Sequence, residues 1–180
     1  MRFVALDVDV TGTSLRRDRV TGIAALPVTA AMLRLADLRY CALATTTGAS
    51  TQPPSDWRSR YLGLREMVMG SPIVTYNPGF VKGMIARSCS MHRLPAIEGD
   101  WLDLVAIAAV VDAEVTELTS MEYWLEEMRS GGSRPHDAAY DVFAMAQMLQ
   151  AVLAYCEEAG IETAESLARN HDARTWLRGG

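Results

Sequence analysis

The chain has 180 residues, of which 49% are hydrophobic and 22% charged, so it can bury the core of one domain and is not expected to be disordered. Its net charge of −5 argues against a broad basic surface that binds polyanions by counterion release. No apolar run approaches the roughly 18 residues of a membrane span, and the stretch before Asp7 is too short for a signal-peptide core. We therefore expect a single cytoplasmic domain over 1–180 with no membrane partner.

The three cysteines Cys41, Cys89 and Cys156 are odd in number and far apart in the sequence. They match neither a disulfide framework nor a zinc-binding pattern. The sequence predicts that they are buried free thiols, because unpaired cysteine is among the most buried residue types.

The first half of the chain favours strands. Phe3 to Val10 is apolar except for Asp7 and Asp9 and ends at Thr11-Gly12, which predicts a buried strand. Further strands are predicted over residues 22–28, 39–44 and 73–76. The polar stretch 45–56, which contains Pro53-Pro54, predicts a loop.

Helices dominate the later part of the chain. They are predicted over residues 57–69, 80–91, 121–128 and 163–169, while 101–111 fits either a strand or a helix. Asp137 is a candidate N-cap for a long helix, whose apolar stripe consists of Val142, Met145, Leu149 and Val152. This order of strands and helices predicts an α/β fold.

Asp7 and Asp9 are the first candidate functional residues. Strand side chains alternate between faces, so two residues spaced by two point the same way. Two neighbouring carboxylates on a buried strand are costly unless a cation lies between them, and Mg²⁺ or Mn²⁺ prefers such oxygen ligands. The alternative is that the strand ends near Leu6 and both carboxylates are solvated.

His136 and Asp141 form a second candidate pair. His136 precedes the predicted cap of the long helix, and Asp141 lies one turn into it. A histidine at a helix entrance is placed to act as general base on a water held by a metal that Asp141 helps to bind. The alternative is a surface histidine and a solvated aspartate.

Three motifs resemble those of the DnaQ-like (DEDDh) 3′–5′ exonucleases. Phe3 to Gly12 resembles the first motif, Asp-x-Glu-Thr-Thr-Gly, and Val74 to Phe80 resembles the second, His-Asn-x-x-Phe-Asp. Arg134 to Asp141 matches the third, His-x-x-x-x-Asp, without a gap, and Trp101 to Leu104 is similar to an intervening segment of the family. The motifs occur in the family's order, and together they are more specific than any one alone.

The resemblance implies an RNase H-like three-layer fold, with a central mixed β-sheet flanked by helices. It also implies hydrolysis at the 3′ ends of single-stranded DNA or RNA, with release of nucleoside 5′-monophosphates at a site for two Mg²⁺ or Mn²⁺ ions. Asp7 would then bridge the metals, Asp9 would take the Glu position and Asp141 the last Asp position. His136 would be the base that accepts a proton from water.

The sequence departs from the family's pattern at the metal ligands. Val81 stands where the second motif has Asp, and Asp9 is shorter than Glu by one methylene, about 1.5 Å. Tyr76 replaces the histidine of the second motif. Asp103 is a candidate substitute carboxylate, although the family's Asp at that position is usually structural. These departures predict reduced activity.

Two hypotheses follow for the function. One is a metal-dependent 3′–5′ exonuclease of reduced activity. The other is an inactive pseudo-exonuclease that serves as a nucleic-acid-binding or protein-interaction domain. A nucleotide-sugar transferase using Asp7 and Asp9 would leave the order of the motifs unexplained. The basic run of Arg16, Arg17 and Arg19 is either a phosphate contact or a solvated turn.

Overall fold

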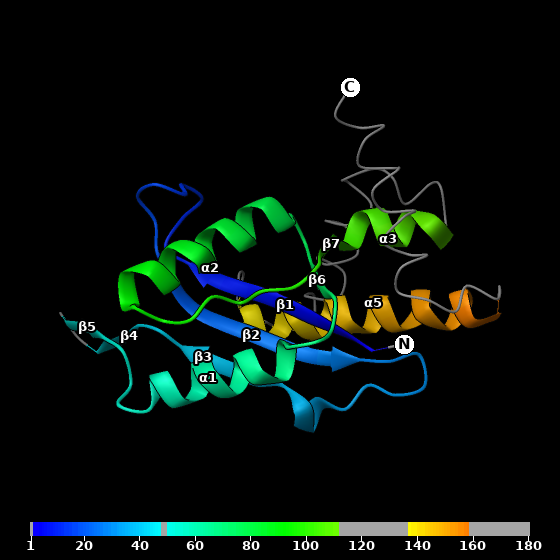
Figure 1. The fold of residues 1–180 in the computed structure, drawn as a ribbon, viewed down its shortest axis with the longest axis horizontal. Coiled ribbons are helices and arrows are strands. Elements are labelled where there is room, and N and C mark those ends of the chain that lie inside the picture. Colours follow the sequence, from blue (N-terminus) through cyan, green and yellow to red (C-terminus); the bar gives the residue numbers. More distant parts are fainter. Residues whose placement is uncertain (1, 48–49, 112–136, 159–180) are drawn as a thin grey trace.

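The computed structural model describes residues 2–47, 50–111 and 137–158. Two long strands, β1 (Phe3–Val10) and β2 (Val20–Val28), pair antiparallel in the middle of the sheet (Figure 1). Their register places Phe3 opposite Val28 at one end and Asp9 opposite Gly22 near the other, just before an irregularity at Val10. The prediction of a buried strand from Phe3 to Val10 is confirmed with its bounds, because its apolar run ends at a turn.

The described part of the chain forms a five-stranded mixed sheet in the order β3-β2-β1-β6-β7. β3 (Arg39–Ala42) pairs antiparallel with β2, whereas β6 (Ile73–Thr75) and β7 (Trp101–Asp103) continue the sheet in parallel from β1. The carboxyl ends of β1 and β6 therefore lie at the same edge of the sheet, which is where open α/β sheets usually carry their ligands.

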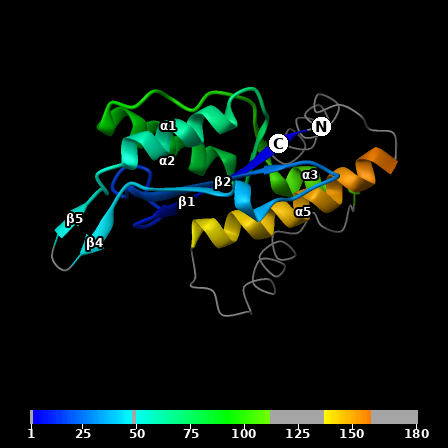
Figure 2. The same ribbon diagram turned by 90° about the horizontal axis from the view of Figure 1, so that it is seen from below.

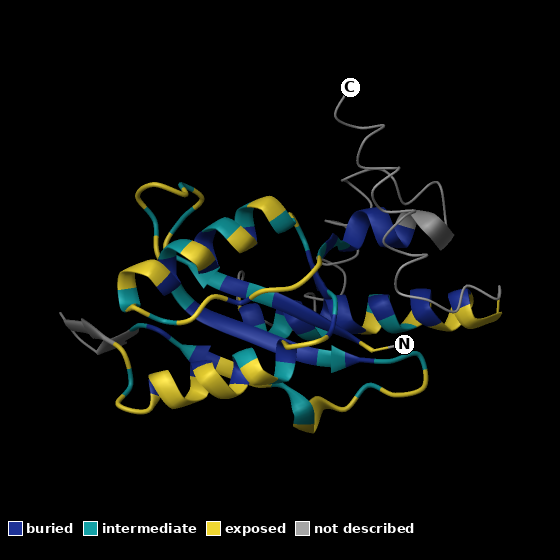
Figure 3. Cartoon of the chain, in the orientation of Figure 1, coloured by how far each residue is buried: buried dark blue, intermediate teal, exposed yellow. Residues whose placement is uncertain are grey.

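Helices cover both faces of the sheet, giving three layers (Figure 2). α1 (Trp57–Val68) and α2 (Pro78–His92) pack on one face, and α3 (Leu104–Val111) and α5 (Ala138–Glu158) on the other. Figure 3 shows the two long strands β1 and β2 mostly buried, with exposed residues on the outer sides of α1 and α2. The predicted α/β architecture is confirmed.

The alternation of β1 decides which side chains face which layer. Val4, Leu6 and Val8 pack in the cluster with α1 and α2, whereas Phe3 and Ala5 pack in the cluster with α5. Because successive strand residues point to opposite faces, Asp7 and Asp9 lie on the face that α5 covers.

The long helix α5 begins as its sequence predicts. The Asp137 Oδ1 atom accepts hydrogen bonds from the backbone N–H groups of Ala139 (3.1 Å) and Tyr140 (3.3 Å), which caps the first turn. The predicted apolar stripe is buried, and it comprises Val142, Met145, Leu149 and Val152. The stripe lies against β1 and β2, so the cap fixes where α5 starts over the sheet.

The predicted loop over residues 45–56 is wrong in part. β4 (Thr45–Thr47) and β5 (Ser50–Gln52) pair antiparallel as a separate two-stranded sheet, and the β-branched threonines explain this preference. The segment 101–111 is both strand and helix, since β7 is followed directly by α3. A short 3₁₀ helix, η1 (Leu35–Asp37), precedes β3. The helices predicted over 121–128 and 163–169 lie outside the described residues.

The three cysteines are free and buried, as predicted. Burial raises the pKa of the Cys41 thiol to about 11, so this thiol stays protonated and unreactive at neutral pH. Within the described ranges, the helices are too short or too polar to cross a membrane.

Candidate functional site

Asp9 connects three elements at the carboxyl end of β1. Its Oδ1 atom accepts a hydrogen bond of 2.7 Å from the backbone N–H of Ala138, the first residue of α5. Its Oδ2 atom accepts a hydrogen bond of 2.9 Å from the Tyr40 hydroxyl on β3. The first of these bonds also places a negative charge at the amino end of α5, where the helix dipole favours it. Asp9 therefore fastens the amino end of α5 to the sheet.

Gly22 is what allows Tyr40 to reach Asp9. It pairs with Asp9 on β2, between β1 and β3. A Cβ atom on Gly22 would collide with the Tyr40 hydroxyl and lie 2.6 Å from the Asp9 Oδ2 atom. Burial, and then the hydrogen bond and charge of Asp9, raise the pKa of Tyr40 above its ordinary value. The phenol consequently remains a hydrogen-bond donor at neutral pH.

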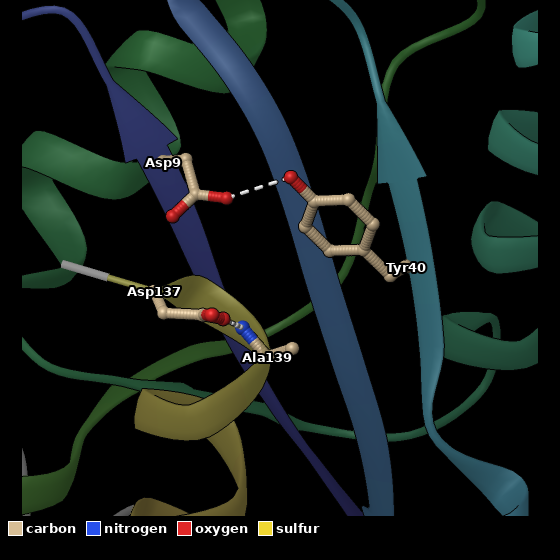
Figure 4. Close-up of a pocket in the computed structure, with 4 residues that line it drawn as sticks. All are labelled: Asp9, Tyr40, Asp137 and Ala139. Carbon is tan, nitrogen blue, oxygen red and sulfur yellow. Dashed lines mark hydrogen bonds between the residues drawn. The ribbon is translucent and has the colours of Figure 1, made fainter. Parts of the chain in front are cut away.

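A cavity of about 470 Å³ opens beside this contact. Asp9, Tyr40, Asp137 and Ala139 line it (Figure 4). The carboxylates come from β1 and from the start of α5, and the phenol comes from β3. The lining thus offers two negative groups and one hydroxyl, which suits a ligand that brings cations or hydrogen-bond donors.

The other predicted site residues belong to the same face of the sheet or lie outside the described residues. Asp7 is half-buried on β1, and Asp141 is buried in the first turn of α5, the helix that covers this face. Both have polar partners. His136 lies outside the described residues. The convergence of Asp7, Asp9, His136 and Asp141 stays a prediction.

The segment that resembles the second motif forms the start of α2, and Val81 occupies the position of the motif's aspartate. Asn77 has a left-handed backbone (φ 55°), and its side chain accepts a hydrogen bond of 3.2 Å from the Phe80 N–H, which caps α2. Val81 follows in the first turn, is 2% exposed and packs in the cluster with Val4, Leu6 and Val8.

Asp103 has a structural role in this arrangement. Its Oδ1 atom accepts a hydrogen bond of 2.9 Å from the Val105 N–H, at the start of α3. This agrees with the structural alternative for this residue.

The divalent cation implied by the resemblance can be tested against these groups. Carboxylates are suitable donors for Mg²⁺ or Mn²⁺, and Asp7, Asp9 and Asp141 supply them from one face. Both oxygens of Asp9, however, already accept protein donors. Among the described residues, no three His, Cys, Asp or Glu side chains gather in a group that could hold a metal ion. Asp7, Asp9 and Asp141, as they lie in this structure, therefore do not form a ready-made metal site, and metal binding by them stays a prediction.

Replacing Tyr40 by Phe is expected to lower the free energy of unfolding by about 1 kcal/mol, because one hydrogen bond to a charged group is lost while water can still reach the cavity. Gly22→Ala should cost more, because its methyl group displaces both Tyr40 and Asp9. Urea unfolding of the two single variants and the double variant measures this. If the losses of unfolding free energy in the two single variants add up to the loss in the double variant, Gly22 and Tyr40 do not share one contact with Asp9.

No family model and no curated protein matches this sequence. Solved structures do match. Exonuclease X in complex with 5′ overhanging duplex DNA superposes with a TM-score of 0.58 at 16% identity, over 94% of this chain and 99% of that one. The nuclease domain of 3′hExo, a DEDDh family member bound to rAMP, gives a TM-score of 0.54 at 14% identity, over 88% and 92%.

A third similar structure is the zinc-bound form of the complex between E. coli exonuclease I and single-stranded DNA. Its TM-score is 0.59 at 16% identity, over 83% of this chain, which spans only 39% of that protein. Together these likenesses show that the chain has the RNase H-like fold of the DnaQ-like, DEDDh 3′–5′ exonucleases. The fold predicted from the motifs is therefore confirmed.

Proposed function

We propose that the chain binds the 3′ ends of single-stranded DNA or RNA and slowly releases nucleoside 5′-monophosphates in a reaction that depends on Mg²⁺ or Mn²⁺. The observation that carries the proposal is the cavity at the carboxyl end of β1, lined by Asp9 and by the capped start of α5. It lies on a fold whose similar structures include exonuclease X in complex with DNA and a DEDDh-family nuclease domain bound to rAMP.

Each side chain has a definite role in this proposal. Asp7, Asp9 and Asp141 would hold the cation, which when bound would supply positive charge at the scissile phosphate and favour deprotonation of water. His136 would accept the proton of that water. The α5 amide of Ala138 and the Tyr40 hydroxyl orient the Asp9 carboxylate. Asp9 is shorter than glutamate and both its oxygens have protein donors, so we expect weak metal binding and slow turnover.

A second candidate function is nucleic-acid binding without turnover. Val81 favours it, because this buried residue completes an apolar cluster where the family's pattern has a metal-binding acid. An apolar group there keeps the helix start stable without a metal, whereas an acid would need one. The two candidates share the binding step and differ only in hydrolysis.

The test is release of labelled mononucleotide from a 3′-labelled single strand in Mn²⁺. We expect slow release by the unmodified chain and a loss of at least about 100-fold in His136→Ala, in keeping with the usual contribution of a general base. His92→Ala, which removes a histidine that does not line the cavity, is the matched control and should retain activity. Release that is unchanged in His136→Ala would identify a contaminating nuclease, and the binding function would replace the proposal.

A further inference from the structure

The loop between β1 and β2 presents three arginines within four residues. Arg16, Arg17 and Arg19 are all exposed. The ion pairs found in the described part of the chain involve Arg34 and Arg60, and they leave these three guanidinium groups without a carboxylate partner there. Exposed arginines without an acidic partner remain available to an external anion.

Asp18 makes this loop a defined structure. Its carboxylate accepts hydrogen bonds from the Thr11 hydroxyl (3.0 Å) and from the Ser14 N–H (2.8 Å). Gly12 lies so close that a Cβ atom on it would be 2.7 Å from the Asp18 Oδ2 atom. The Asp18 carboxylate therefore points into the loop, where it bonds to Thr11 and Ser14. The three arginines belong to a turn that these bonds hold in one conformation.

The loop is also fixed to α2. Arg87 donates hydrogen bonds to the backbone carbonyls of Leu15 and Asp18, and the Leu15 side chain lies over Gly83. α2 contains no acidic residue, and Lys82 beside Gly83 is exposed. We call the surface made by Arg16, Arg17, Arg19 and Lys82 the basic face. It stands out in a chain whose net charge is −5.

We propose that the basic face binds the phosphodiester backbone of the nucleic-acid strand whose 3′ end occupies the cavity at Asp9. The inference rests on the proposed function and assigns the surface that holds the rest of the strand. The loop starts at Thr11, two residues after Asp9, so the loop and the cavity both lie at the carboxyl end of β1. Guanidinium groups bind phosphate oxygens in pairs of parallel hydrogen bonds.

The charge distribution favours a narrow strand over a flat anionic membrane. A membrane would bring the acidic remainder of the surface close to its own negative charge, whereas a strand touches only the few basic groups in its path. Phosphate contacts of this kind position a strand and do not read its sequence.

The experiment measures binding of a fluorescent single strand of about 20 nucleotides by anisotropy in EDTA, so that neither metal nor turnover contributes. The variant carries Arg16→Ser, Arg17→Ser and Arg19→Ser together. The control carries Arg34→Ser, Arg39→Ser and Arg58→Ser, which removes the same charge from exposed positions elsewhere. Thermal unfolding of both variants verifies that they fold.

We expect the loop variant to bind at least about tenfold more weakly at low salt and to lower the slope of log K against log salt by about 1–2, because each phosphate contact on a single strand contributes about 0.7. The control variant should keep the slope. Equal losses in both variants, no binding by the unmodified chain, or a loss confined to anionic lipid vesicles would each overturn the assignment. Intact binding with no mononucleotide release would leave it standing and remove only the hydrolysis.

Discussion

Val81→Asp is expected to raise the rate of mononucleotide release in saturating Mn²⁺ by about 10–100-fold, the usual range for groups that support a metal site. The residue lies at the end of the first turn of α2, four positions after the asparagine cap that matches the family's second motif. An added carboxylate would supply the acid that this motif lacks. In the absence of metal the same change should lower the free energy of unfolding by about 3 kcal/mol, because the charge replaces a side chain that is 2% exposed.

Val81→Asn is the matched control for this prediction. The amide has nearly the shape of the acid and is also polar, but it is uncharged and binds a divalent cation poorly. Metal should therefore stabilise the Asp variant and leave the Asn variant nearly unchanged, as unfolding with and without Mn²⁺ would show. If the two variants release mononucleotide at equal rates, a carboxylate at position 81 does not contribute to a metal site. Nucleic-acid binding without turnover would then be the better supported function.

Changes at Asp9 are expected to separate its two roles. Asp9→Ala leaves the Ala138 N–H and the Tyr40 hydroxyl without their acceptor, so the free energy of unfolding should fall by about 2–3 kcal/mol. Asp9→Asn keeps an oxygen for the α5 amide and should cost only about 1 kcal/mol. It should nevertheless weaken Mn²⁺ binding by about 10–100-fold, because the charge is gone.

Calorimetric titration with Mn²⁺ and urea unfolding of the same samples would measure both effects. Asp9→Glu provides the complementary case. The longer side chain moves the carboxylate, so we expect it to lose one of the two hydrogen bonds of 2.7 Å and 2.9 Å. The Asp9→Glu variant should therefore be less stable, even though glutamate is the family's residue at this position. Unchanged Mn²⁺ binding in Asp9→Asn would mean that Asp9 is purely structural.

The sequence predicts the elements whose signals are local. β1 is an apolar run closed by a turn, and α5 is an apolar stripe that follows an aspartate cap, so both are found. The pairing of β4 with β5 is missed, because the prolines and polar residues around it are typical of loops.

The contact between Asp9 and Tyr40 has no local signal. The two residues are 31 positions apart and belong to different strands, so only the register of three strands brings them together. Gly22 is the clue that the sequence does contain, since a glycine opposite an acid in a strand marks a close approach of another side chain. The motif resemblance names Asp9 but gives no reason to expect a phenol beside it.

The hydrogen bond between Asp9 and Ala138 joins positions 129 residues apart. During synthesis β1 and β2 leave the ribosome long before α5, so the face of the sheet that carries Phe3, Ala24 and Leu26 has no helical cover until most of the chain has been made. Contacts of such long range form late, because closing a large loop costs entropy before any packing is gained. The nascent chain therefore exposes an apolar sheet face that can aggregate with other chains. A chaperone that binds this face until α5 docks would prevent such aggregation.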